Sequence, residues 1–371
     1  MQQLAQNGYT DQDVRTALQK PVREWSFRYE LLDVDNTKLR ELNNVTSCSI
    51  DYNSLADIKR TAKFLIDDKE DIDFLSNRIK PYIRLKMPPK TGVENEYVEW
   101  PQGVFLLSTP VRNTTATDNI LRDVEAYDQL LVYKDDKVGV RYSVDEGELY
   151  TDAISTLLGS IDVNLTPSTE TLPTTLEWPP GSPKLKIINS LLTSINYNSL
   201  HFGPEGRAII RPYRSPSNEP SEYTYANDQH SVMLPEVMQE RDLFSIANKW
   251  ILVVSEADQT PMVSTHTNDN PSSSTSTTNR GRTIVDFREE ESASSQSTLD
   301  AKVLRLAFEA SQIYEAIEFE TGLMPFHGHS DIYTLAFSTL GLDAKFSEHT
   351  WSYELRAGAK MSHRARRVVT I

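Results

Sequence analysis

Two histidines near the end of the chain come nearest to a catalytic or metal-binding motif. His327 and His329 lie two residues apart in residues 325–331, and Asp331 follows them. Imidazole and carboxylate groups that project from one loop or strand edge can ligate a divalent metal such as zinc. The segment resembles the first part of the metallo-hydrolase pattern, but Ile332 stands where that pattern needs another histidine. We therefore favour a loop in which both imidazoles cap or hydrogen-bond the backbone.

A second candidate is a run of carboxylates. It could chelate calcium, which takes several hard oxygen ligands from a sharply turned loop, but the run contains no glycine to make that turn. A solvated charged turn is the better interpretation, because like charges usually remain in water. A glycosidase would need two carboxylates across a cleft, and 53 acidic residues give no means of choosing one pair. The run consists of Asp67, Asp68, Glu70, Asp71 and Asp73.

Motifs for nucleophilic catalysis and for nucleotide binding are missing from the sequence. There is no Gly-x-Ser-x-Gly elbow, and Cys48 falls in an expected strand, where packing explains it better than activation. Residues 203–206 are rich in glycine but lack the lysine and the following helix of a phosphate-binding loop. We therefore assign no catalytic, cofactor-binding or metal-ligating residue, and we expect a non-enzymatic protein without a cofactor.

The net charge argues against some partners. The sequence holds 38 basic and 53 acidic residues, and the formal charge of −15 disfavours a nucleic-acid footprint built from lysine and arginine. A single cysteine cannot form an internal disulfide, and the sequence has no signal peptide and no stretch of about 18 apolar residues. We therefore expect a soluble chain that folds inside the cell. One basic patch near the C-terminus could meet phosphates, but in a chain of this charge we expect it to face an acidic surface of a partner subunit. It comprises Arg356, Lys360, His363, Arg364, Arg366 and Arg367.

The elements that position these residues begin with a short helix over residues 11–20, which Thr10 or Asp11 can cap. From residue 25 the apolar period changes to two, and residues 33–36 supply a turn, which predicts a β-hairpin. Five or six strands with short polar breaks indicate a barrel or a sandwich. We take residues 1–20 as a helical arm and residues 21–148 as a first β-barrel domain. Further strands are predicted at residues 48–52, 61–66, 82–85, 103–108 and 121–127.

The middle of the chain, residues 149–240, is expected to be a smaller α+β region. Residues 150–158 predict one helix, and a second helix begins near Pro183, where a proline costs little. Residues 162–183 contain five prolines and predict a crossing loop without regular structure. A hairpin is predicted next, with strands at residues 197–201 and 207–212 around a turn at 202–206.

Residues 241–371 are expected to form a second β-barrel domain. The continuous apolar run at residues 250–255 predicts a strand buried on both faces. Residues 264–279 are almost wholly Ser, Thr, Asn and Asp, so we expect a polar surface loop of that domain. An apolar stripe predicts the longest helix over residues 298–318. The remaining strands are predicted at residues 283–287, 331–340 and 350–357.

Eight segments, taken in this order, carry a resemblance to a known family. They are residues 25–32, 54–64, 124–128, 185–197, 206–213, 279–282, 318–321 and 325–331. Together they resemble the siphophage tail-tip baseplate hub, or tail-associated, protein family, and through it the central hub of contractile-tail baseplates. The resemblance spans nearly the whole chain. The expected architecture, a mainly β protein with an α+β middle, fits many functions, and the resemblance points to one of them.

The resemblance implies a virion structural protein at the distal tip of a bacteriophage tail. A homotrimer of such subunits, each with two tube-like β-barrel domains, would form a pseudo-sixfold ring under the tail tube and let DNA pass on infection. The implied partners are the distal tail protein ring, the tape measure protein and tail fibre or receptor-binding proteins, in particles assembled in the host cytoplasm. Family members commonly continue into a fibre or a peptidoglycan hydrolase, and because this chain stops at Ile371 we expect no enzyme. The resemblance gives His327 and His329 no catalytic role.

Two alternatives stay open. A distal tail or tail tube ring subunit would assemble with sixfold rather than threefold symmetry. A particle-borne cell-wall hydrolase would need a carboxylate pair that the sequence does not single out. The charge of −15 has two readings as well: an acidic channel wall would let DNA pass without binding it, and a general effect on solubility explains the charge equally well.

Overall fold

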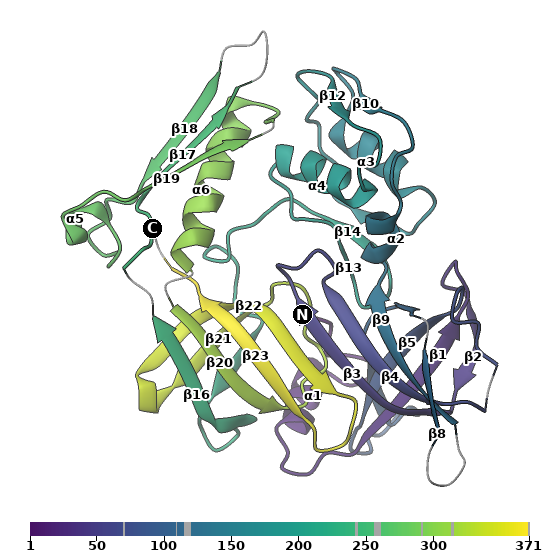
Figure 1. The fold of residues 1–371 in the computed structure, drawn as a ribbon. Coiled ribbons are helices and arrows are strands. Elements are labelled where there is room, and N and C mark those ends of the chain that lie inside the picture. Colours follow the sequence, from purple (N-terminus) through teal and green to yellow (C-terminus); the bar gives the residue numbers. More distant parts are fainter. Residues whose placement is uncertain are drawn as a thin grey trace.

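The computed structural model describes residues 1–69, 71–108, 110–114, 120–241, 244–255, 261–290, 292–312 and 315–369. Strands account for 42% and helices for 16% of it, so the expected mainly β class is confirmed. No helix in these ranges is long and apolar enough to cross a membrane. Figure 1 shows a large sheet at the base of the molecule and two smaller lobes that rise from the same side of it.

The first half of the large sheet contains the hairpin that the sequence predicts. β1 (Trp25–Leu32) pairs antiparallel with β2 (Lys38–Leu42) around the turn at residues 33–36. α1 (Asp11–Leu18) precedes the hairpin and begins with a reciprocal capping box between Thr10 and Asp13. The alternating pattern is clearest in β4 (Arg60–Asp67), where every second side chain is buried. The other strands are β3 (Val45–Asn53), β5 (Arg78–Lys86), β6 (Tyr97–Pro101), β7 (Phe105–Leu107), β8 (Val111–Thr114) and β9 (Ile120–Asp128).

The second half of the large sheet continues the first without a break. β22 (Leu342–Glu354) pairs antiparallel with β3, which sets Trp351 opposite Tyr52, and their rings stack with centroids 5.0 Å apart. One hydrophobic cluster runs through both halves. The described strands follow an open path from β16 to β2, which does not confirm the two expected closed barrels. The remaining elements are β15 (Tyr223–Ala226), β16 (Met233–Arg241), β20 (Glu315–Gly322), β21 (Ile332–Phe337), a 3-10 helix (Ser338–Leu340) and β23 (Lys360–Arg367).

The middle lobe has a hydrophobic core of its own. Its helices α3 (Tyr150–Leu158) and α4 (Lys184–Ser194) lie where the sequence predicts them, and Pro183 is the N-cap of α4. The expected crossing loop at residues 162–183 is wrong in part. β11 (Val163–Leu165) and β12 (Leu176–Trp178) lie within it, because pairing with distant strands satisfies their backbone groups. The other elements are α2 (Leu130–Asp135), β10 (Tyr142–Val144), β13 (His201–Phe202) and β14 (Ala208–Ile210).

The last lobe departs most from the expectation. β17 (Lys249–Val254), β18 (Met262–Thr267) and β19 (Val285–Glu290) form a separate sheet, so these residues of the expected second barrel stand outside the large sheet. Burial alternates along β17, which is therefore not buried on both faces, and α6 (Gln296–Gln312) contacts this sheet. The predicted helix at residues 298–318 is too long, because β20 begins at Glu315. Ile313 and Tyr314 of its apolar stripe lie outside the described residues.

The polar segment at residues 264–279 lies at the surface, with half of its residues exposed, and hydrogen bonds hold it in place. It contains the end of β18 and the short helix α5 (Thr277–Arg280). Asn268 is 1% exposed; its carbonyl oxygen accepts from the Thr277 amide at 2.8 Å and its side-chain amide donates to Ser273 Oγ at 2.9 Å. Hydrogen bonds here replace apolar contacts, which composition alone does not reveal.

Candidate functional site

His327 is buried, with 1% of its surface exposed, in the loop between β20 and β21. Its Nδ1 atom is hydrogen-bonded to a carboxylate oxygen of Glu348 on β22. Its Nε2 atom lies 2.6 Å from the hydroxyl of Tyr225 on β15. The expectation of backbone partners is therefore wrong for this imidazole, whose partners are side chains from two strands.

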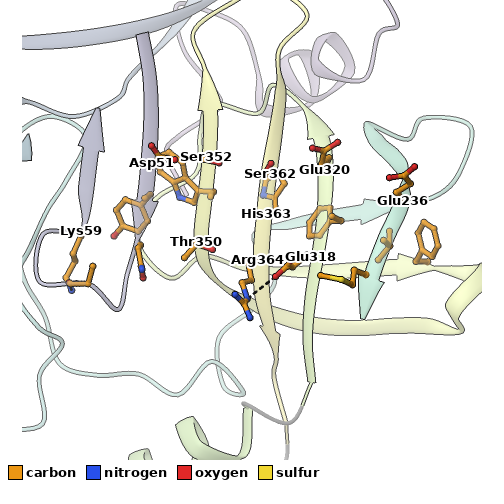
Figure 2. Close-up of a pocket in the computed structure, with 18 of the residues that line it drawn as sticks. Asp51, Lys59, Glu236, Glu318, Glu320, Thr350, Ser352, Ser362, His363 and Arg364 are labelled. Carbon is orange, nitrogen blue, oxygen red and sulfur yellow. Dashed lines mark hydrogen bonds and ion pairs between the residues drawn. The ribbon is translucent and has the colours of Figure 1, made fainter. Parts of the chain in front are cut away.

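His363 reaches the same carboxylate from β23. Burial alternates along this strand, so His363 points inward while Ser362 and Arg364 face the groove drawn in Figure 2. Its Nδ1 atom lies 2.6 Å from Oε1 of Glu348, and its Nε2 atom lies 2.8 Å from Oγ1 of Thr321. Both imidazoles thus have a partner at each ring nitrogen.

The three side chains form one buried unit with Glu348 as the shared acceptor. Burial by itself would raise the pKa of Glu348, but the facing imidazoles of His327 and His363 outweigh it and hold the pKa at about 2. Burial lowers the pKa of His363. Each imidazole can donate its Nδ1–H group to the ionised carboxylate of Glu348, which accepts both.

The geometry of this unit argues against a metal. Its ligand atoms all lie within 4.8 Å of one another, which makes it the candidate metal group among the described residues. Zinc bonds of about 2.0–2.1 Å would hold neighbouring ligand atoms roughly 3 Å apart. The 2.6 Å between His363 Nδ1 and Glu348 Oε1 is shorter and is a hydrogen-bond distance. His327, His363 and Glu348 therefore fit a structural cluster better than a metal centre.

His329 does not join His327, although the two lie close in sequence. Its Nδ1 atom lies 2.5 Å from the Tyr52 hydroxyl, and its ring stacks on His201 of β13 with centroids 3.9 Å apart. Burial and the neighbouring imidazole hold the pKa of His329 well below its usual value. The two histidines that the sequence singles out thus belong to different environments.

The carboxylate run of residues 67–73 forms ion pairs and turn contacts instead of a calcium site. Asp68 pairs with Arg122 at 2.6 Å and with Arg112 at 2.9 Å. Asp73 accepts from the Ser76 hydroxyl at 2.6 Å within its own turn. These carboxylates point to separate partners, so they do not converge on one ion. Glu70 lies outside the described residues.

Cys48 is packed in β3, as the sequence predicts. It is 2% exposed, and burial raises its pKa well above the usual value. A thiol that stays protonated is a poor nucleophile. Cys48 is therefore part of the core.

The exposed face of the large sheet carries a groove that crosses both halves and is lined by apolar side chains and a row of polar ones. The register sets Asp51, Ser352, Ser362 and Glu320 side by side across β3, β22, β23 and β20, and Figure 2 shows these side chains in a row. The groove has a volume of about 980 Å³. Its acidic residues outnumber its basic ones, and Arg364 is neutralised by Glu318 at 3.3 Å. The charged residues labelled there are Asp51, Glu236, Glu318, Glu320, Lys59 and Arg364.

The basic C-terminal patch is largely neutralised within the chain. Arg366 is the exception: its guanidinium has no hydrogen bond or ion pair with any described residue. The other residues of the patch pair with acids of the same chain, at neighbouring positions or on neighbouring strands. These pairs are Arg356–Glu354 at 3.2 Å, Lys360–Glu320 at 2.9 Å, Arg364–Glu318 at 3.3 Å, Arg367–Glu315 at 2.8 Å and His363–Glu348 at 2.6 Å.

Several described strands of the large sheet have one unpaired edge, among them β16 at one end of the strand path and β8 on a branch from β9. Among the described strands, β16 pairs only with β20 and β8 pairs only with β9. Each carries an exposed apolar side chain: Met238 on β16 is 57% exposed and Val111 on β8 is 63% exposed. An unpaired edge with apolar side chains is a template for pairing with another chain.

Comparison with known proteins identifies the fold. No protein-family model matches the sequence, and a comparison with curated proteins finds no significant match. Three solved structures are similar over nearly their whole length. A tail protein from Neisseria meningitidis has a TM-score of 0.64 at 11% identity, covering 92% of this chain and 96% of that one. The 43 kDa tail protein of prophage MuSo2 from Shewanella oneidensis has a TM-score of 0.62 at 10% identity, covering 91% of this chain and 98% of that one. Prophage tail protein gp18 from Listeria monocytogenes has a TM-score of 0.55 at 11% identity, covering 91% of this chain and 94% of that one.

Proposed function

These structural neighbours are tail proteins rather than enzymes, and we propose that this chain is a structural hub subunit of a bacteriophage tail tip. The observation that carries the proposal is the single open sheet, whose two halves share one polar face and end in unpaired edges. A subunit with two open edges is suited to a closed ring, because each edge can pair with the next copy. The likeness over more than 90% of the chain supports the same role.

In this proposal three copies form the ring. Each half of the large sheet acts as one tube-like domain, so three subunits supply six similar domains and a pseudo-sixfold wall. β16 of one copy pairs with β8 of the next, which covers Met238 and Val111. The two smaller lobes lie away from the base of the sheet (Figure 1), where they leave its edges accessible to neighbours.

The polar face of the sheet lines the channel in the assembled ring. Its row of Asp51 and Glu320 and its groove rich in acids would repel the DNA backbone and let it pass on ejection. The ring sits at the siphophage tail tip, below the distal tail protein ring, and contacts the tape measure protein and tail fibre or receptor-binding proteins. Assembly takes place in the host cytoplasm. These partners follow from the family resemblance.

Catalysis has no part in the proposal. Glu348, His327 and His363 bind one another in the core, where no substrate reaches them, and Cys48 is buried. Zymography on cell-wall material is expected to show no clearing by the purified chain. A cleared band that disappears in a matched variant of a groove carboxylate, such as Glu318→Gln, would support a cell-wall hydrolase instead.

The ring interface is tested by changing its two edges. Val111→Lys and Met238→Lys each place a charge on an edge that the ring must pair, so each is expected to shift the purified protein from oligomer to monomer. Val140→Lys is the matched control, because Val140 is 75% exposed in a loop away from both edges. Oligomers that survive both edge variants unchanged would contradict this interface. A sixfold assembly would favour the distal tail or tail tube alternative.

A further inference from the structure

A second cavity lies where the large sheet, the middle lobe and α6 meet. Its volume is about 720 Å³, a size typical of sites for small molecules. Loop residues before β4, the segment after β14, the last turns of α6 and the strands β22 and β23 all contribute to its wall. It adjoins the acidic groove, with which it shares Ala56 and Lys59, and carries the opposite balance of charge.

Several buried polar atoms in this cavity have no hydrogen-bond partner. Gln312, at the end of α6, is 2% exposed, and its Nε2 atom has no acceptor among the described residues. The Tyr213 hydroxyl and the Nε2 atom of His349 are likewise buried without a partner there. A buried polar group without a partner costs free energy, so three around one cavity indicate a missing ligand or ordered water.

Three cations of the cavity also make no ion pair with a described carboxylate. Lys59 is 5% exposed, and its ammonium donates only to the carbonyl oxygens of Ser54 at 2.9 Å and Ala56 at 3.2 Å. Arg211 and Arg366 make no ion pair with a described carboxylate. This is unusual in a chain with an excess of 15 acidic residues.

The acids that line the same cavity make their ion pairs with other cations, and Asp57 and Glu309 act on Lys59 and Arg366 only from a longer distance. Asp57 pairs with Lys134 at 3.2 Å, and Glu309 pairs with Arg305 at 2.8 Å. Glu219 lies 3.8 Å from the exposed Arg214. The cavity therefore keeps unpaired positive charge and unused hydrogen-bond donors on one wall.

We propose that this cavity binds a small multiply charged oxyanion, of the phosphate or phosphomonoester class. A guanidinium presents its N–H groups in a planar fork that matches such oxygens, so Arg366 supplies the main contact. The side-chain amide of Gln312 and the Tyr213 hydroxyl donate to further oxygens, and Lys59 and Arg211 supply charge. The bound anion would give these groups the partners that they lack. The proposal concerns the folded chain itself and does not depend on ring assembly.

Calorimetric titration of the full chain with inorganic phosphate, and separately with glucose 6-phosphate, tests the proposal at constant ionic strength and pH. We expect saturable binding of at least one probe, with a matching rise in the thermal midpoint. If phosphate binds, the cavity is a site for the bare anion. If only glucose 6-phosphate binds, the cavity also contacts the organic part of the ligand. Failure of both probes to bind at millimolar concentration would overturn the proposal.

Variants locate the site. Arg366→Gln is expected to weaken binding at least about tenfold, the usual effect of losing a charge-assisted hydrogen bond. Arg364→Gln on the same strand is the matched control, because Arg364 faces the other groove and already pairs with Glu318. Equal losses in the two variants would mean attraction by surface charge alone and would overturn the site. Arg211→Gln is a second probe at an exposed position, where folding is not at risk, and is expected to weaken binding as well.

Discussion

The imidazole rings of His201 and His329 stack with their centroids 3.9 Å apart and their planes inclined by 17°. His201 belongs to β13 of the middle lobe, and His329 belongs to the loop that leads into β21 of the large sheet. Both rings are buried, and burial lowers the pKa of His201 to about 4. The contact therefore joins two parts of the molecule through a pair of groups that favour the neutral state.

The first prediction concerns pH. A histidine with a pKa of about 4 when folded and 6.5 when unfolded contributes stability above pH 6.5 that is lost as the pH falls towards 4. For His201 the loss amounts to roughly 3 kcal/mol. We expect the free energy of unfolding, measured in urea between pH 7.5 and 4.5, to fall steeply.

A variant isolates this contribution. His201→Phe keeps an aromatic ring against His329 but cannot take up a proton, so its stability should change less between pH 7.5 and 4.5 than that of the unaltered chain. The exposed His230→Phe is the control and should keep the original slope. An unchanged slope in His201→Phe would refute the assignment.

The second prediction concerns the buried carboxylate. Glu348→Gln replaces an acceptor for two imidazole N–H groups by an amide that also donates, so one N–H loses its partner. We expect a loss of about 3–5 kcal/mol in the free energy of unfolding. Glu354→Gln on the same strand removes only a surface pair with Arg356 and should cost less than about 1 kcal/mol. Equal stability of the two variants would show that the cluster contributes little.

The third prediction concerns the polar segment of the last lobe. Asn248 is fully buried; its side chain donates to the carbonyl oxygens of Thr275 at 3.3 Å and Arg282 at 3.0 Å, and accepts from the Ile284 amide at 2.8 Å. Asn248→Ala removes all three bonds and should cost roughly 2–4 kcal/mol. Limited proteolysis within residues 264–282 should become faster, while the exposed Ser274→Ala leaves the rate unchanged. A segment cut equally fast in both proteins would be a loose loop after all.

The fourth prediction concerns the acidic face. The unaltered chain should not retard duplex DNA even at low salt, because cations on this face such as Lys360 and Arg364 are paired with Glu320 and Glu318. Asp51→Lys, Glu318→Lys and Glu320→Lys combined should create salt-sensitive binding. The control changes the exposed Glu94, Asp145 and Glu146 to Lys, which alters net charge equally but lies elsewhere. If both triple variants bind DNA equally, net charge explains the binding and the acidic face has no special part in it.

Local periodicity predicts much of this fold, and its failures have physical reasons. The strands of the first half follow alternation because one face of each is buried, as in β4. The helix at residues 298–318 is overextended because Ile317 and Phe319 also suit a strand, so the apolar stripe passes from one period to the other without a break. The packed segment around Asn268 depends on hydrogen bonds, which leave no apolar signal.

The clusters depend on contacts between distant residues. Glu348 lies 21 residues from His327 and 15 from His363, so only strand pairing brings the three together. His327 stands out in the sequence because histidines are few, but nothing near Glu348 distinguishes it from the 52 other acidic residues. The unpaired state of Arg366 is likewise invisible until its neighbours on β23 are seen to be paired.

The most direct test of the hub proposal is the mass and symmetry of the assembled protein. Native mass spectrometry of the full chain, with electron microscopy of the same sample, should give three times the 42.1 kDa of one chain and a threefold ring with six similar domains around a channel. A monomer at micromolar concentration, or a ring of six copies, would contradict the proposal.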